Sequence, residues 1–196
     1  MATSDAAIDT LGEPAVGPWA YTSLAVMLAS MAVWPAFVAW GGVWFTISDA
    51  MGLVFASVTI PVVVGLDRWF SPHSPSLARA ARWVGLAGMV LIGAGSVLLI
   101  AGQVSHEFAP AQGGLGVQIA GYGLWGVWLL LTAELSRRAG TLGRIVPRAG
   151  YTIGVAIVLG MVGATQGPDH PITIAAGTIL FIGLVVWTVA VARATR

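Results

Sequence analysis

The stretch from Gly121 to Gly150, GYGLWGVWLLLTAELSRRAGTLGRIVPRAG, constrains the fold more than any other part of the chain. It begins with an apolar run long enough to cross a bilayer, which ends in Glu134, Arg137 and Arg138. A short loop then adds two more arginines before a second apolar run begins. This pattern is typical of two membrane helices joined by a basic cytoplasmic loop.

The overall composition agrees with a chain that is embedded in lipid. Of 196 residues, 57% are hydrophobic and 9% are charged, whereas roughly a quarter of the residues in a soluble domain are charged. A soluble fold of this size could not bury so much apolar surface, so we predict an all-α polytopic membrane protein whose main partner is the lipid bilayer. The net charge of +1 offers no clustered basic face to a nucleic acid.

The inventory of reactive side chains is small. The chain contains no cysteine, which excludes disulfides, thiolate metal sites and covalent c-type haem. All nine basic residues are arginines, so no lysine is present to form a Schiff base with retinal or pyridoxal, or to serve in a phosphate-binding loop. Three histidines and eight acidic residues therefore provide most of the groups that could carry chemistry.

Six apolar segments follow one another along the chain. Gly41 and Gly42 divide the first long stretch into two, and polar loops separate the others. Ser74 and Pro75 have the character of a cap and a first helical residue, so the third helix is expected to start before its apolar run. The predicted membrane segments are residues 18–40, 44–65, 83–102, 116–136, 149–165 and 171–192, in one domain over 18–192 between a mobile N-terminal tail (1–17) and a C-terminal tail (193–196).

The positions of the arginines predict how these six transmembrane helices are oriented. Three lie between the second and third segments, four lie between the fourth and fifth, and two follow the sixth, while the other connections have none. Because arginine-rich loops are retained in the cytoplasm, we predict that both termini and both tails are cytoplasmic. The loops around residues 41–43, 103–115 and 166–170 are then on the outer side.

Spaced glycines in the third and fifth segments predict close helix packing. Gly88 and Gly154 would let neighbouring backbones approach, so we expect both segments to lie inside the bundle. Each of these segments also follows an arginine and leads to an outer histidine. Three repeated in-out-in hairpins would explain this pattern, although general membrane constraints produce much of it as well.

Two stretches of the chain are similar to a known kind of membrane protein. Residues 123–163, GLWGVWLLLTAELSRRAGTLGRIVPRAGYTIGVAIVLGMVG, combine a membrane helix, a basic loop and a glycine-rich helix, and in ISDAMGLVFASV, residues 47–58, an aspartate opens a helix. Over about residues 44–192 the chain resembles a group of small six-helix bacterial integral membrane proteins of unknown function. Their basic loop typically reads R-x-G-x-L-P-R-x-L-G, from which Gly143 and Pro147 depart here. The resemblance implies six helices and a plasma membrane location, and it carries no catalytic residues.

Five ionisable residues fall on the outer side of this topology: Asp49, His106, Glu107, Asp169 and His170. The last four form a candidate site for a divalent metal, because imidazole nitrogen and carboxylate oxygen are common metal ligands. The two histidines would instead supply axial ligands to a haem. The simpler interpretation is favoured, in which His170 caps the last helix and the others lie in solvated loops, so no cofactor is predicted.

Asp49 is the most informative single residue, since it lies five residues after Trp44 inside the second predicted segment. An ionisable group within a bilayer is costly and normally faces the bundle or a wet cavity, where it finds a partner. Gln118, at similar depth in the fourth segment, is the candidate partner. The two residues form a candidate ion or proton site, and the alternative is a structural or surface-hydrated carboxylate.

Two further patterns on the fourth segment have simple explanations. Glu134 stands three and four residues before Arg137 and Arg138, which is the spacing of ordinary ion pairs on a helix surface. Trp125 and Trp128 share one helix face, and the favoured interpretation is that they fill the bundle or contact lipid. The alternative is that both line a pocket for a cationic or sugar ligand.

Three classes of function remain open at this point. The favoured one is a small non-enzymatic bundle that acts as an accessory or sensory protein and binds lipid, a membrane protein partner or a second copy in a homo-oligomer. The second is a transporter or channel for a small solute, a proton or a cation, which requires a polar path across the membrane. The third is a membrane enzyme or redox protein that uses the outer histidines and carboxylates.

The predicted topology can be tested with reporter fusions. A reporter fused after Arg196 should report the cytoplasm, and one inserted within residues 108–113 should report the opposite compartment. Activity of both fusions in the same compartment would contradict the prediction of six crossings.

Overall fold

The computed structural model describes residues 16–40, 42–105, 108–164 and 171–195. These residues form six helices and no strand, so the all-α prediction is confirmed for this part of the chain. The helices are α1 (Val16–Trp40), α2 (Val43–Phe70), α3 (Pro75–Ser105), α4 (Phe108–Ala139), α5 (Ile145–Ala164) and α6 (Pro171–Ala194).

The helix ends differ from the predicted segments in an informative way. α3 begins at Pro75 as expected, and the backbone N–H of Ala78 donates to the carbonyl of Ser74 at 2.9 Å. α2 continues past residue 65 to Phe70, and α1 begins at Val16, inside the predicted tail. Hydropathy marks the part of a helix that contacts hydrocarbon, whereas the backbone hydrogen bonds of a helix continue into the polar interface. The rest of the predicted tail, residues 1–15, lies outside the described residues.

Five of the helices are long and apolar enough to cross a membrane. Judged on the described residues, these spans are Val43–Phe70, Pro75–Ser105, Gln112–Ala139, Ile145–Gly163 and Ala175–Ala194. A crossing needs about 20 mainly apolar residues, and each span provides a stretch of this kind. The chain therefore has the features of a helical membrane protein, while the crossing predicted for α1 stays a prediction.

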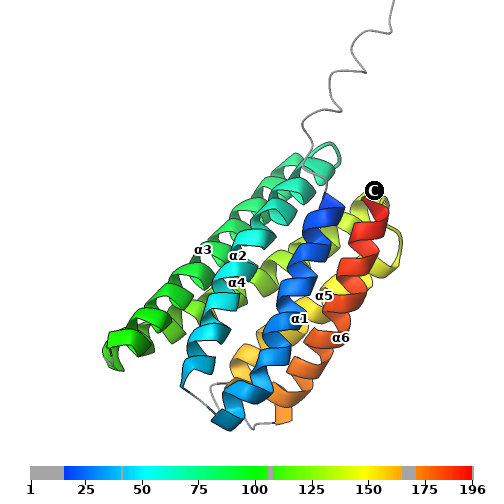
Figure 1. Cartoon of the computed structure of the whole chain (residues 1–196). Coiled ribbons are helices and arrows are strands. Elements are labelled where there is room, and N and C mark those ends of the chain that lie inside the picture. The colour runs from blue at the N-terminus through cyan, green and yellow to red at the C-terminus, as the bar shows by residue number, and fades with distance from the viewer. Residues whose placement is uncertain (1–15, 41, 106–107, 165–170, 196) are drawn as a thin grey trace, which may run out of the picture.

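The helices pack as a closed ring in which each one contacts its neighbours in the chain (Figure 1). Contact between α1 and α6 completes the ring, and α2 also contacts α4. The start of α1 and the end of α6 lie at the same end of the bundle (Figure 1). A Cβ atom placed on Gly17 would be only 3.1 Å from the carbonyl oxygen of Ala192, which shows how closely these two ends approach.

The ends of α1 and α6 share their side of the bundle with the α2–α3 and α4–α5 connections, since successive helices alternate in direction (Figure 1). All arginines that the structure describes therefore gather at this end, called here the arginine end: Arg68, Arg79, Arg82, Arg137, Arg138, Arg144, Arg148 and Arg193. The separation of arginines from the other connections thus persists in three dimensions. Which side of a membrane this end faces remains a prediction.

Close backbone approach at glycines holds α4 between its neighbours. A Cβ atom on Gly121 of α4 would lie 2.6 Å from the backbone nitrogen of Ile92 and 2.9 Å from the carbonyl oxygen of Gly88 on α3. On the other side of α4, a Cβ atom on Gly154 of α5 would lie 2.9 Å from the carbonyl oxygen of Gly126. Close coverage of Gly88 and Gly154 by a neighbouring helix, predicted from the sequence, is confirmed.

The predicted central position of α3 and α5 is wrong. Within the described residues α3 contacts α2 and α4, α5 contacts α4 and α6, and both helices are members of the ring. Their glycines occupy only the faces that meet these neighbours. The opposite faces carry apolar side chains such as Val90 and Val162, which are 62% and 59% exposed and are suited to contact with lipid.

The three predicted hairpins are neighbours in the ring, but α2 also packs extensively on α3, so they are not separate units.

Two alanine substitutions on α4 should differ in their effect on the stability of the fold. Gly121→Ala should lower the free energy of unfolding by about 1–3 kcal/mol, because the added methyl group must push α3 away. Gly123→Ala, two residues on, should be neutral or should raise it by about 0.5–1 kcal/mol, since alanine favours a helix and a Cβ atom there meets nothing within 4 Å. Thermal unfolding in detergent measures both changes, and equal effects would contradict the close contact at Gly121.

Candidate functional site

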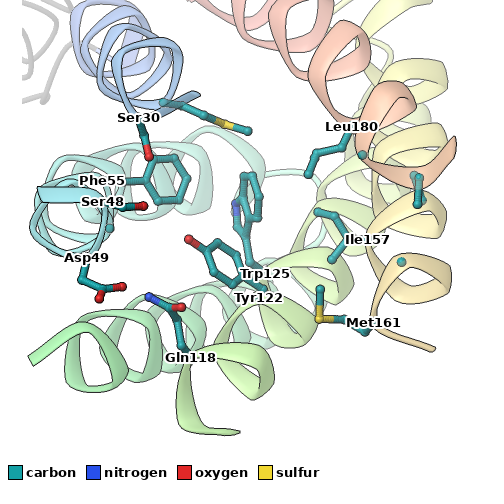
Figure 2. A pocket seen from close by; sticks show the side chains of 16 residues that line it. Ser30, Ser48, Asp49, Phe55, Gln118, Tyr122, Trp125, Ile157, Met161 and Leu180 are labelled. Carbon is teal, nitrogen blue, oxygen red and sulfur yellow. The ribbon is translucent and has the colours of Figure 1, made fainter. Parts of the chain in front are cut away.

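A cavity of about 440 Å³ lies between α1, α2, α4, α5 and α6 (Figure 2). It is in the half of the bundle away from the arginine end, because its walls include the first turns of α2 and α6 and the last turns of α5. α3 stands outside it, behind α2 and α4. Pockets that bind small molecules typically enclose about 300–1,000 Å³, so the size suits a small ligand.

The lining of this cavity is mainly apolar, with a few polar groups on one side. Methionine, leucine, isoleucine, alanine and glycine residues of α1, α5 and α6 make up much of the wall. Asp49 and Ser48 of α2 and Gln118 and Tyr122 of α4 bring polar atoms to the opposite side (Figure 2). An apolar pocket with a few convergent polar groups is the usual design of a ligand site. We call it the Asp49 cavity.

Asp49 finds a hydrogen-bond partner on α3. The side-chain nitrogen Nε2 of Gln103 donates to Oδ2 of Asp49 at 2.7 Å, and the hydroxyl of Thr46 donates to Oε1 of Gln103 at 2.7 Å. The carboxylate is half-buried at the edge of the cavity. The expectation that this intramembrane acid faces the bundle and has a partner is therefore confirmed.

Gln118, the predicted partner of Asp49, lines the same cavity. Its amide end points toward the carboxylate (Figure 2), while its Nε2 donates to the hydroxyl of Ser96 on α3 at 3.0 Å. Gly52 allows α2 to approach this pair, since a Cβ atom there would lie 2.8 Å from Oγ of Ser96 and 3.5 Å from Nε2 of Gln118. The structure thus brings the two predicted residues together, and it adds α3 side chains that hold them.

The Asp49 carboxyl group has no cationic partner among the described residues. No basic side chain lines the Asp49 cavity in the part of the chain that the structure describes, and the described arginines lie at the other end of the bundle. Asp67 and Glu134, the other two acidic residues described, are also at the arginine end, where both pair with arginines. Gln103 donates a hydrogen bond from a neutral amide, so it stabilises the carboxylate but does not balance its charge.

Aromatic rings form the wall next to this charge. Trp125 is only 3% exposed, and the rings of Phe55 and Tyr122 meet it edge-on with centroid distances of 5.2 and 6.3 Å. The indole N–H of Trp125 has no hydrogen-bond partner among the described residues. Buried tryptophan N–H groups usually find a partner, so this one is available to a ligand or to water.

Trp128, predicted to share a pocket with Trp125, takes a different position. It lies deeper in the bundle, where its ring meets that of Trp187 at a centroid distance of 5.9 Å. Both tryptophans border a much smaller void of about 10 Å³ between the cavity and the arginine end. Trp125 therefore lines a cavity, as in the pocket alternative, whereas Trp128 fills the bundle beneath it, as the favoured interpretation expected.

The four residues of the candidate metal or haem site cannot be placed. His106, Glu107, Asp169 and His170 all lie outside the described residues. Among the residues that are described, no group of three or more histidine, aspartate or glutamate side chains is arranged to hold a metal ion. Metal or haem binding by the outer loops therefore stays an alternative to the favoured interpretation, in which no cofactor is bound there.

The ion pairs expected for Glu134 are present at the arginine end. Nη2 of Arg137 and Nε of Arg138 both lie within hydrogen-bond distance of Oε1, at 2.7 and 2.6 Å. The hydroxyl of Tyr151 on α5 also donates to Glu134, which links α4 to α5. The spacing along one helix predicted the two arginines, whereas nothing in the sequence pointed to a partner on another helix.

Three polar residues of the site were missed by sequence reasoning: Ser96, Gln103 and Tyr122. Gln103 was assigned to an outer loop because the apolar run ends at residue 102, but α3 continues to Ser105. The available signal was the rarity of polar residues in these helices, each of which needs a partner in a bilayer. That signal shows that a partner is needed but does not identify it.

No family model, curated protein or solved structure matches this chain. The resemblance to small six-helix membrane proteins therefore stays a prediction.

The partnership of Asp49 and Gln103 predicts a specific loss of stability. Gln103→Leu should lower the free energy of unfolding by about 1–3 kcal/mol, because the half-buried carboxylate loses its donor. Gln112→Leu, at an exposed position on α4, should change it by less than about 0.5 kcal/mol. Unfolding of Gln103→Leu, Asp49→Ala and the Asp49→Ala/Gln103→Leu double variant measures the coupling, and strictly additive effects would contradict the hydrogen bond.

Proposed function

We propose that the chain crosses the plasma membrane six times, with both termini in the cytoplasm. α1 has 25 residues, which correspond to about 37 Å of helix at 1.5 Å per residue and exceed the hydrocarbon thickness of about 30 Å. It also packs between α2 and α6 as a full member of the ring. The collection of arginines at one end supports a cytoplasmic location for that end.

We further propose that the protein binds a small organic cation in the Asp49 cavity. The observation that carries this proposal is a half-buried carboxylate that has no balancing cation among the described residues and lies on the wall of an apolar, aromatic cavity. A positively charged ligand would remove the electrostatic cost of this carboxylate. Such binding falls within the favoured class of small non-enzymatic, ligand-binding bundles.

The chemistry of the lining favours an organic cation over a metal ion. Rings of tryptophan, tyrosine and phenylalanine attract cations that lie within about 6 Å of the ring centre, and Trp125, Tyr122 and Phe55 stand together at this wall. Calcium takes six to eight oxygen ligands, but the described lining of the cavity contributes a single carboxylate and a few neutral oxygens. The apolar wall formed by α5 and α6 would contact the hydrocarbon part of an amine or ammonium compound.

Transport of such a cation is a second candidate function. Between the cavity and the arginine end, the small void is bordered by the hydroxyls of Ser23, Thr59 and Thr188. Ser23 and Thr59 are hydrogen bonded to each other at 2.8 Å, and the rings of Trp125, Trp128 and Trp187 close the space around them. These hydroxyls are polar groups along the axis of the ring, so a passing solute would meet them once the tryptophans moved.

Binding of tetraphenylphosphonium, a lipophilic organic cation, tests the proposed cation site in the Asp49 cavity. The purified protein should bind it, and Asp49→Asn should weaken binding by at least about tenfold, or 1.4 kcal/mol, because the attraction to the carboxylate is lost. The matched control is Asp67→Asn on the same helix, whose carboxylate pairs with Arg82 at the arginine end. Isothermal titration calorimetry in detergent gives the affinities.

Equal affinities of the parent protein and Asp49→Asn would reject the cation site. Uptake of the same cation into proteoliposomes separates the two candidate functions. Accumulation or exchange that depends on Asp49 would favour transport, whereas binding without movement across the bilayer would favour a sensory or accessory role.

A further inference from the structure

A second cavity, of about 540 Å³, lies at the arginine end where α4 turns into α5. It is separate from the Asp49 cavity and shares no lining residue with it. Its walls combine the last residues of α4, the turn itself and the first turns of α5. The polar residues that line it are Ser136, Arg137, Arg144, Arg148 and Tyr151.

The charge in this second cavity is strongly positive. Glu134 accepts hydrogen bonds from Arg137 and Arg138, so one carboxylate is shared between two guanidinium groups. Arg144 and Arg148 are exposed and make no ion pair with any acidic residue that the structure describes. Three arginines therefore line the cavity, and only Arg137 among them pairs with an acidic residue that the structure describes, which leaves an excess of positive charge that suits an anion.

Ser136 provides an independent sign that a ligand belongs in this cavity. The residue lines the cavity and is fully buried, with 0% of its surface exposed, yet its hydroxyl has no hydrogen-bond partner among the described residues. A buried polar group without a partner costs about 1–3 kcal/mol. An anionic oxygen bound in the cavity would accept the missing hydrogen bond.

The backbone of the turn keeps this cavity open. Gly140 and Gly143 both adopt a left-handed conformation, with φ of 67° and 70°, and both line the cavity. A Cβ atom on either glycine would meet nothing within 4 Å, so the turn leaves space that side chains do not fill. α5 begins two residues after Gly143, and the first N–H groups of a helix have no partner within the helix and attract anions.

We propose that this cavity binds a phosphate group, carried either by an anionic phospholipid or by a soluble phosphate compound. Guanidinium groups bind phosphate oxygens with two parallel hydrogen bonds, and Arg144 and Arg148 are available to do so. The hydroxyl of Ser136 and the start of α5 would bind the remaining oxygens. Arg137 is already oriented by Glu134, and it adds positive charge to the wall.

Two ligands distinguish the two sources of phosphate. Pyrophosphate tests soluble phosphate and is followed by thermal unfolding in detergent, while phosphatidylglycerol tests a lipid and is followed by native mass spectrometry, with phosphatidylcholine as the zwitterionic reference. We expect at least one of the two to bind. Arg144→Gln/Arg148→Gln should weaken that binding by at least about tenfold, since charge-assisted hydrogen bonds are lost.

A matched control removes the same number of charges from the same end of the bundle. Arg79→Gln/Arg193→Gln changes two exposed arginines that do not line the cavity, and it should weaken binding by less than about threefold, as expected for the loss of exposed charges outside the site. Equal weakening by the two double variants would overturn the proposal, because it would show attraction to general surface charge. Failure of both ligands to bind the parent protein would overturn it as well.

Ser136→Ala separates a built site from electrostatic attraction without changing any charge. In the absence of ligand this variant should be as stable as the parent or more stable, since it removes an unpartnered buried hydroxyl. It should nevertheless weaken binding of the phosphate ligand by about threefold to tenfold, in line with the loss of a hydrogen bond to a charged group. Unchanged affinity in Ser136→Ala would remove the serine from the site and reject the built cavity.

Discussion

The close contact of α4 with α3 on one side and α5 on the other is the constraint on which the rest of the structure depends. At Gly121 the backbones of α3 and α4 approach so closely that a methyl group would not fit, and Gly126 and Gly154 bring α5 to the other side of α4. In a bilayer, where lipid is as apolar as leucine, such close packing takes the place of the hydrophobic effect in holding helices together. Because α4 is fixed on both sides, Gln118, Tyr122 and Trp125 are held in place on the wall of the Asp49 cavity.

The two ends of the bundle have opposite chemical preferences. In the part of the chain that the structure describes, one end holds a single carboxylate among aromatic and apolar side chains, and the other holds arginines around a cavity with an unpartnered hydroxyl. Between them the rings of Trp125, Trp128 and Trp187 fill the bundle. This layer keeps the two cavities apart, so that a cation at one end and an anion at the other would bind without direct contact.

The polar network beside the Asp49 cavity illustrates how few polar groups a membrane bundle needs in order to build a site. Thr46, Gln103 and Asp49 form one chain of hydrogen bonds, and Gln118 and Ser96 form another. Both cross from one helix to another, so they fix the relative positions of α2, α3 and α4 as well as orienting the cavity side chains. The same residues therefore hold the helices together and shape the proposed binding cavity, so a substitution that disturbs the packing would also disturb the cavity.

The sequence by itself determined the apolar helices, the collection of arginines at one end, the need of Asp49 for a partner and the ion pairs of Glu134. These features follow from composition, from charge counts and from spacing within one helix. Only the tertiary structure decided that α3 and α5 belong to a ring and not to a centre, and that Asp49 pairs with Gln103. It also decided that Tyr151 reaches Glu134 and that Ser136 lines a cavity without a partner. These features depend on which faces of different helices meet, and in chains built from alanine, glycine, valine and leucine many faces are nearly equivalent. The choice among them is made by close steric fit at a few glycines, which residue periodicity does not encode.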